Sequence, residues 1–181
     1  MSATLALSVT GLAASIGVGL ILFGAGLTKL RHRALLPGVI ANYRLLPAAV
    51  VTPAAIALPL AEIAVGGLLL IGVRPLPVLL GAGLLGLFAL AMAINLLRGR
   101  SHISCGCGRP ELSQSLGWPL VARNLLLAAA LLPRLAEPAP LAMLDLATAL
   151  GAGVSLWLLY QLLASIAAIA PTPVHTHARR K

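Results

Sequence analysis

Charged side chains are scarce in this sequence, and their scarcity excludes a water-soluble globular domain. They make up 9% of the 181 residues, against about 25% in an ordinary soluble domain. The mean hydropathy is +1.02, and several apolar runs are long enough to form transmembrane helices. The runs are continuous and rich in Leu, Ala and Gly, which disfavours the alternating pattern of a β-barrel. The sequence therefore predicts an all-α fold, a polytopic transmembrane helical bundle.

Acidic residues are the rarest charged type, with 4 Asp and Glu against 13 Lys and Arg, for a net charge of +9. In a soluble protein such an excess of cations would suggest nucleic-acid binding. Here the cations lie in short connections and at the C-terminus, where a membrane protein sets its orientation. We therefore expect the lipid bilayer as a partner, and no nucleic acid.

Lys and Arg are also absent before the first apolar run, which is longer than the core of a signal peptide. We therefore expect this run to remain as a membrane span. The sequence predicts a single transmembrane domain over residues 1–170, with a four-helix core and a fifth C-terminal span. Residues 171–181 are expected to form a disordered basic tail. The predicted spans cover residues 9–30, 53–73, 76–97, 119–132 and 141–169.

The cations are distributed unevenly over the connections between these spans. The connections and the tail alternate between many and few Lys and Arg residues, starting with many after the first span. Cation-rich connections face the cytoplasm. This predicts a multi-pass protein of the inner cell membrane, with its N-terminus outside and its C-terminus and the loop 101–117 in the cytoplasm.

Few polar residues interrupt the spans, and Glu62 is the most prominent because it lies near the middle of the second span. A carboxyl group at that depth must be paired or protonated, so it should face the bundle. Its candidate partners are Lys29, Arg123 and Asn124. Two interpretations remain open for Glu62: a structural ion pair or hydrogen bond between helices, and a residue that couples proton or redox changes.

The cations beside the first connection have a simpler interpretation. Lys29 ends the first span, where a long cationic side chain commonly extends to the membrane surface. Tyr43 and Arg44 follow in the connection and suit the membrane interface. A short helix lying on the surface is expected there.

Cysteine is limited to two residues, Cys105 and Cys107, and both lie in the loop after the third span. In an extended chain their Cα atoms would be roughly 6.6–7.2 Å apart, at the edge of the disulfide limit of about 6.8 Å. Gly106 allows the backbone to bend and bring them closer. A bond closed in so small a ring is strained and easily reduced, which suits a redox-active pair better than a structural crosslink.

The surroundings of the two cysteines favour the thiolate form. Arg98, Arg100 and His102 are near in sequence, and neighbouring cations lower the pKa of a thiol. Besides thiol–disulfide exchange, two alternatives remain. His102, Cys105 and Cys107 could hold Cu(I) or Zn, although a closed zinc site needs a fourth ligand that is not evident, so no metal is predicted. The third interpretation is a pair of inert loop cysteines.

Together these features resemble the MauE/DoxX-like family of redox-associated membrane proteins. The resemblance covers about Val9 to Leu132, and the order and spacing of its parts make it specific. Its parts are Phe23-Gly24-Ala25-Gly26, Lys29-Leu30, Tyr43-Arg44-Leu45-Leu46-Pro47, Glu62 with Gly66, Leu97-Arg98-Gly99-Arg100, Cys105-Gly106-Cys107-Gly108, Trp118 and Arg123-Asn124.

The resemblance implies a helical bundle that assists disulfide formation or thiol redox balance in partner proteins, in connection with methylamine metabolism. Cys105 and Cys107 match the redox pair of the family, which would make the chain a candidate thiol–disulfide oxidoreductase. The implied partner is a thioredoxin-like or disulfide-bearing protein. The polar positions of the family are matched by Lys29, Arg44, Glu62, Arg123 and Asn124.

The sequence leaves open the electron acceptor and an alternative function. Electron relay through the membrane needs a second cysteine pair or a quinone, and the chain has no second pair. No cofactor is assigned, and a quinone is the candidate. The alternative is a non-catalytic membrane subunit, or a transporter for metal or small solutes, that uses Glu62 and the Cys/His loop.

Overall fold

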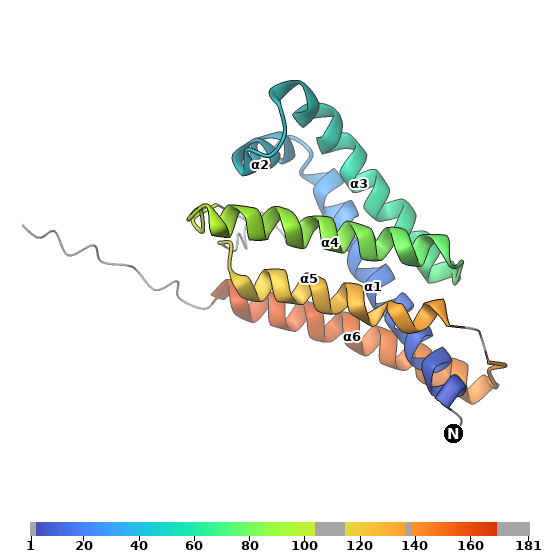
Figure 1. The fold of residues 1–181 in the computed structure, drawn as a ribbon. Coiled ribbons are helices and arrows are strands. Elements are labelled where there is room, and N and C mark those ends of the chain that lie inside the picture. Colours follow the sequence, from blue (N-terminus) through green and yellow to red (C-terminus); the bar gives the residue numbers. More distant parts are fainter. Residues whose placement is uncertain (1–2, 104–114, 137–138, 170–181) are drawn as a thin grey trace, which may run out of the picture.

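The computed structural model describes residues 3–103, 115–136 and 139–169. Within these ranges the chain is helical and contains no β-strand, so the predicted all-α class is confirmed. The helices, shown in Figure 1, are α1 (Ala3–Arg31), α2 (Leu36–Tyr43), α3 (Ala48–Ile71), α4 (Leu76–Leu97), α5 (Trp118–Ala130), the 3-10 helix η2 (Leu132–Leu135) and α6 (Met143–Ile169).

Four of the described helices are long and apolar enough to cross a membrane: α1, α3, α4 and α6. At 13 residues, α5 is shorter than these four. Its length is about 20 Å, from a rise of about 1.5 Å per residue. The four residues of η2 add about 8 Å, because a 3-10 helix rises about 2 Å per residue. Together α5 and η2 approach the ~30 Å thickness of the hydrocarbon core.

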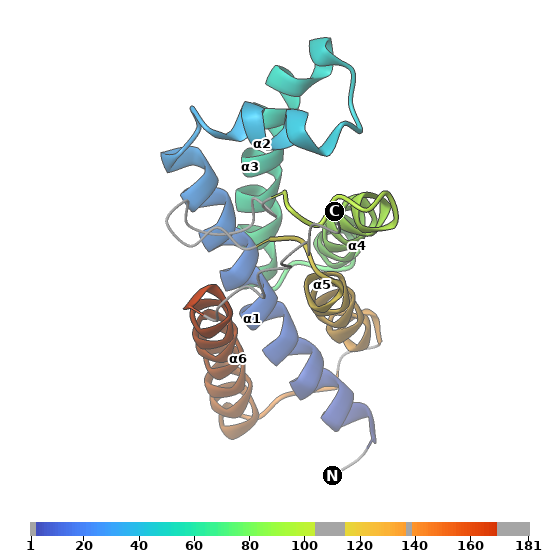
Figure 2. The same cartoon turned by 90° about the vertical axis from the view of Figure 1, so that its left-hand side faces the viewer.

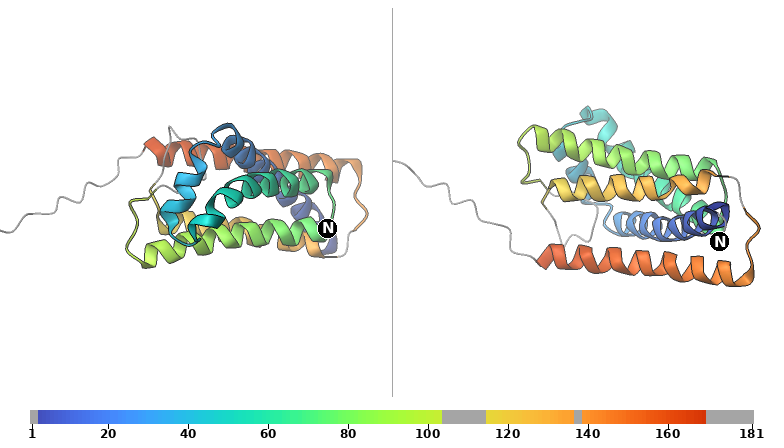
Figure 3. Two further views of the ribbon diagram at one scale, coloured as in Figure 1. Left: turned by 90° about the horizontal axis from the view of Figure 1, so that it is seen from above. Right: turned by 60° about the horizontal axis from the view of Figure 1, so that its bottom comes forward.

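The bundle is built around α1. This helix packs against α3 and α6, while α4 pairs with α5 (Figure 2). Both views of Figure 3 show α6 along one edge of the bundle. Where the helices meet, their apolar side chains form a continuous core that includes Leu22, Leu69, Leu85 and Leu131.

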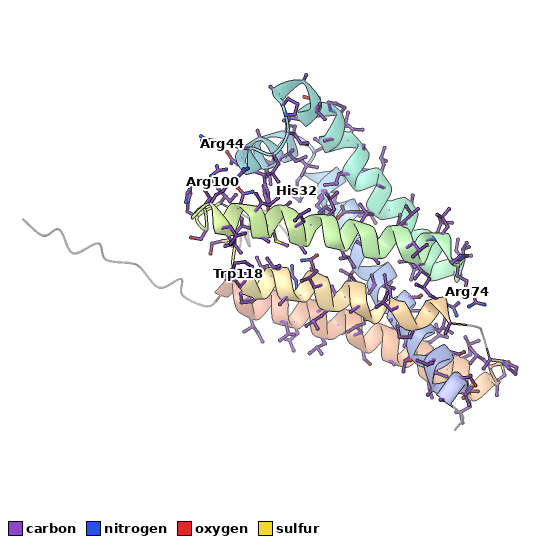
Figure 4. All side chains as sticks on the ribbon, viewed as in Figure 1. His32, Arg44, Arg74, Arg100 and Trp118 are labelled. Carbon is purple, nitrogen blue, oxygen red and sulfur yellow. The ribbon has the colours of Figure 1, made fainter. Side chains whose placement is uncertain are left out.

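The chain crosses the bundle back and forth, so its connections gather at two ends (Figure 1). At one end α1 finishes, α2 lies across the bundle, α3 starts, α4 finishes and α5 starts. We call it the cationic end, because it carries Arg31, Arg33, Arg44, Arg98 and Arg100. The far end holds the α3–α4 turn and η2. Figure 4 shows Arg44 and Arg100 at the cationic end and Arg74 at the far end.

The contact between α1 and α3 depends on glycine. A Cβ atom added at Gly26 would lie 2.8 Å from the Pro59 carbonyl oxygen, and one added at Gly66 would lie 2.7 Å from the Phe23 backbone nitrogen. Small residues let helix backbones approach this closely in a membrane. This close approach brings the last turns of α1 against the middle of α3.

The observed helices differ from the predicted spans more in their first residues than in their last residues. The first helix begins at Ala3 instead of residue 9, and α3 begins at Ala48 instead of residue 53. Pro53 was expected to mark a helix start, but α3 continues through both Pro53 and Pro59. Proline is tolerated inside membrane helices, because neighbouring helices and local adjustments can satisfy the freed backbone groups.

Candidate functional site

A buried ion pair joins α1 to α3. The ammonium of Lys29 donates a hydrogen bond to Oε1 of Glu62, and only 9% of Lys29 and 1% of Glu62 are exposed. The Lys29 Nζ also lies 5.0 Å from the centroid of the Phe88 ring on α4, within cation–π range. Lys29 therefore does not extend to the membrane surface; it is the partner of Glu62 within the bundle.

The helix packing explains how the pair forms. Gly26 precedes Lys29 by one turn and contacts the stretch of α3 that carries Glu62: its added Cβ would lie 3.1 Å from the Glu62 Cβ. The backbones are therefore close enough for the side chains to meet without solvent between them. Among the described residues, Oε2 of Glu62 has no hydrogen-bond partner. The carboxylate thus keeps one acceptor oxygen unused inside the bundle.

The other two candidate partners of Glu62 lie elsewhere. The guanidinium carbon of Arg123 lies 4.9 Å from the Tyr160 ring centroid, which links α5 to α6. Asn124 is buried, and its amide donates to the Leu120 carbonyl within α5 at 2.8 Å. Of the three candidate partners, Lys29 is the one that pairs with Glu62, and Arg123 and Asn124 make other contacts. These residues belong to the α5 side of the bundle.

Backbone carbonyls at the end of α2 bind arginines from the end of α4. Arg98 donates to the Arg44 carbonyl at 3.5 Å, and Arg100 donates to the Tyr43 carbonyl at 3.4 Å. Arg100 also donates to Oδ1 of Asn95 at 3.0 Å. The left-handed backbone of Arg44 (φ 49°) ends α2 here, while its side chain remains exposed (Figure 4).

The predicted dithiol, Cys105 and Cys107, lies outside the described residues. Its described neighbours fix where the segment leaves and rejoins the bundle: the Leu116 amide donates to the Ile103 carbonyl at 3.0 Å. Ile103 and Leu116 are both buried, in a cluster with Met92 of α4. The segment therefore starts and ends at the cationic end, with exposed His102 just before Ile103.

A pocket of about 230 Å³ lies between the end of α1, α2, α3 and α4. Its walls are aliphatic except for Phe88, Tyr43 and the side chain of Lys29. The sequence analysis missed this pocket and the buried Asn95. A polar amide in an otherwise apolar helix was the available signal for Asn95. The pocket had no comparable signal, since it depends on how α2 folds back onto α3.

Metal binding was one of the alternatives for the loop. In the part of the chain that the structure describes, no three His, Cys, Asp or Glu residues are grouped so that they could hold a metal ion. Because Cys105 and Cys107 lie outside that part, the proposed set of His102 with the two cysteines stays a hypothesis.

Comparison with known proteins identifies the family. The family described as Methylamine utilisation protein MauE matches residues 7–137. The chain is 40% identical over 149 residues to Methylamine utilization protein MauE of Paracoccus denitrificans, covering 80% of each chain. It is 43% identical over 143 residues to the protein of that name in Paracoccus versutus, covering 75% of each. For the Methylorubrum extorquens protein of that name the identity is 43% over 146 residues, covering 78% of each.

No solved structure shows a significant match to the chain. The family match takes in α1 to η2, which include the Lys29–Glu62 pair, the pocket and the cysteine segment. It leaves out α6, which completes the bundle on the other side of α1. On the extent of this match and the identity to these relatives, the chain belongs to the methylamine utilisation protein MauE family.

Proposed function

We propose that this chain is a membrane thiol–disulfide redox protein of methylamine utilisation, and that Cys105 and Cys107 are its reactive pair. Membership of the MauE family supports the process. The observation that carries the chemistry is the hydrogen bond between Ile103 and Leu116, which ties both ends of the cysteine segment to the cationic end. The only two cysteines of the chain belong to this segment, and its described flanks lie at the end where the arginines gather.

The chemistry is an exchange between two dithiol–disulfide pairs. A thiolate of a partner attacks the Cys105–Cys107 disulfide and forms a mixed disulfide, and the second partner thiol then displaces the bound cysteine. The partner loses two electrons and two protons, and the cysteine pair gains them. Nearby cations favour the thiolate that must leave. Arg98 and Arg100 are the described cations closest in sequence.

The remaining polar residues have supporting roles in this proposal. The Lys29–Glu62 pair fixes α1 against α3, while Arg123 fixes α5 against α6 through Tyr160. Asn124 is a structural residue of α5, since its amide is bonded within its own helix. The exposed side chain of Arg44 is available to a partner at the cationic end. His102 is exposed and precedes the cysteine segment in the chain.

The partner is proposed to be a thioredoxin-like or disulfide-bearing protein that meets the cationic end. The uneven distribution of arginines between the two ends favours the cationic end in the cytoplasm and the N-terminus outside. On this proposal the protein exchanges thiols at the cytoplasmic face of the inner membrane.

The test measures dithiol exchange and looks for a trapped mixed disulfide with the partner. Cys105→Ser and Cys107→Ser should each abolish dithiol exchange, and one of them should accumulate a mixed disulfide, because the resolving thiol is missing. Ser101→Ala, an exposed position before the segment, is the matched control and should retain exchange. Wild-type exchange by the double serine variant contradicts the proposal. So does a redox titration without a two-electron transition between about −100 and −350 mV, the range of known exchange proteins.

A second candidate is a non-catalytic subunit or a transporter, and the buried Lys29–Glu62 pair favours it. Intramembrane ion pairs often lie on ion or solute pathways. Metal that co-purifies in stoichiometric amount and is lost in Cys105→Ser would support this function. Metal-free protein that still exchanges thiols would exclude its metal-transport form.

A further inference from the structure

We propose that the pocket beside α2 binds the ring of a membrane-dissolved quinone, which accepts the electrons of the cysteine pair. This inference rests on the proposed function, because it supplies the electron acceptor for that exchange. The pocket is the cavity of about 230 Å³ enclosed by the end of α1, α2, α3 and α4.

The size and walls of the pocket suit a substituted aromatic ring. A protein cavity of about 150 Å³ lined by aliphatic and aromatic side chains binds benzene, so this pocket has room for a ring with small substituents. Phe88 and Tyr43 supply aromatic walls, and Met92 and Leu58 supply aliphatic ones. Ligand sites combine such apolar walls with few polar groups that fix orientation.

Lys29 is the polar group that distinguishes a quinone from a lipid acyl chain. An ammonium has three N–H donors, and Glu62 accepts one of them. The remaining donors are available to a carbonyl oxygen, which a quinone has at each end of its ring and an acyl chain lacks. Because Glu62 balances the charge, Lys29 can stay in this apolar site, and its Nζ lies 5.0 Å from the ring centroid of Phe88, which also lines the pocket.

The wall of the pocket includes a residue on the outer surface of the bundle. Leu87 lines it and is 54% exposed, and this residue lies halfway along the membrane-spanning α4 (Leu76–Leu97). A ligand that enters there comes from the hydrocarbon region of the bilayer. Lipid-soluble quinones diffuse in that region, whereas water-soluble acceptors do not.

The pocket lies next to the described residues that flank the cysteine segment. Met92 lines the pocket and also belongs to the buried cluster that holds Ile103 and Leu116, the residues that flank the segment. The electron balance is complete. As the sulfur–sulfur bond forms, the two thiols lose two electrons and two protons, and the quinone takes up both and becomes a hydroquinone.

Binding is tested first, with purified full-length protein and decylubiquinone. Wild-type protein should bind it saturably, at one molecule per chain. Ala54 lines the pocket, so Ala54→Phe should weaken binding at least tenfold. Ala57 is exposed on the same helix and outside the pocket, so Ala57→Phe is the matched control and should bind normally. Absent saturation, or equal loss in both variants, overturns the proposal. Displacement by decanol, which has the alkyl tail without the ring, shows an acyl-chain site and also overturns it.

Turnover then separates this inference from the proposed function. With dithiothreitol as electron donor, wild-type protein should accelerate decylubiquinone reduction, measured by ultraviolet absorbance. Cys105→Ser should lose this rate and keep binding, whereas Ala54→Phe should lose the rate and keep reactive thiols. If quinone binds but Cys105→Ser still reduces it, the cysteine function fails and the pocket assignment stands. If Ala54→Phe reduces quinone at the wild-type rate, the pocket assignment fails and the cysteine function stands.

Discussion

At the scale of single residues, Lys29 and Glu62 form a pair in which each member requires the other. Removing one partner of a buried ion pair leaves an uncompensated charge and costs about 3–5 kcal/mol. We expect Lys29→Met to lose stability of this size. Lys29→Met combined with Glu62→Met should regain much of it, because no buried charge then remains. Denaturant unfolding in mixed micelles, followed by tryptophan fluorescence, measures both.

Arg31→Met provides the control for this pair, because Arg31 is an exposed cation only two residues further along α1. It should unfold like the wild type, since surface charges contribute little to stability. If the double variant is less stable than Lys29→Met alone, then the two side chains stabilise the fold by more than the neutralisation of each other's charge. The sequence offered Lys29 as one of three candidate partners for Glu62, because a membrane carboxyl must find a counter-charge, but it favoured a Lys29 that extends to the membrane surface.

At the scale of helices, the contact between α1 and α3 depends on one glycine of a neighbouring pair. A Cβ at Gly66 would lie 2.7 and 2.8 Å from backbone atoms of α1, which cannot move separately from their helix, while a Cβ at Gly67 meets nothing within 4 Å. We expect Gly66→Ala to lose about 1–3 kcal/mol, the usual cost of overpacking. Gly67→Ala should be unchanged or slightly more stable, because alanine favours helix. The same unfolding assay compares them, and equal effects would contradict this account of the contact.

The sequence predicted where the helices lie better than it predicted how they pack against one another. The apolar runs predicted helices well, because a backbone in lipid must satisfy its hydrogen bonds as a helix or a closed barrel, and continuous apolar runs disfavour a barrel. The sequence offered Arg123 and Asn124 as partners of Glu62, but which way they face depends on how α5 packs against its neighbours in the folded bundle. The Tyr160 contact of Arg123 depends on α6, which is distant in sequence. The pocket depends on the fold of α2, which the sequence suggested only as a surface helix.

At the scale of the whole molecule, the distribution of arginines predicts that the cationic end faces the cytoplasm. In cells that express the protein, a membrane-impermeant maleimide should therefore label Cys105 and Cys107 only after permeabilisation. Val73 is exposed at the far end, so Val73→Cys in a chain without other cysteines should be labelled in intact cells. The opposite labelling pattern would reverse the orientation and place the exchange chemistry outside. Labelling is read by mass spectrometry or gel shift.

The arginine distribution has an energetic consequence for the folded protein. The cationic end carries five arginines among the described residues, namely Arg31, Arg33, Arg44, Arg98 and Arg100, and the far end carries Arg74 and Arg134. Moving one charge through a potential of 100 mV involves about 2.3 kcal/mol, so this excess of three charges corresponds to about 7 kcal/mol per 100 mV. In the proposed orientation, an energised membrane with a negative interior thus holds the cationic end inside continuously, long after insertion is complete. The electrochemical gradient of the cell becomes part of what fixes the topology of this protein.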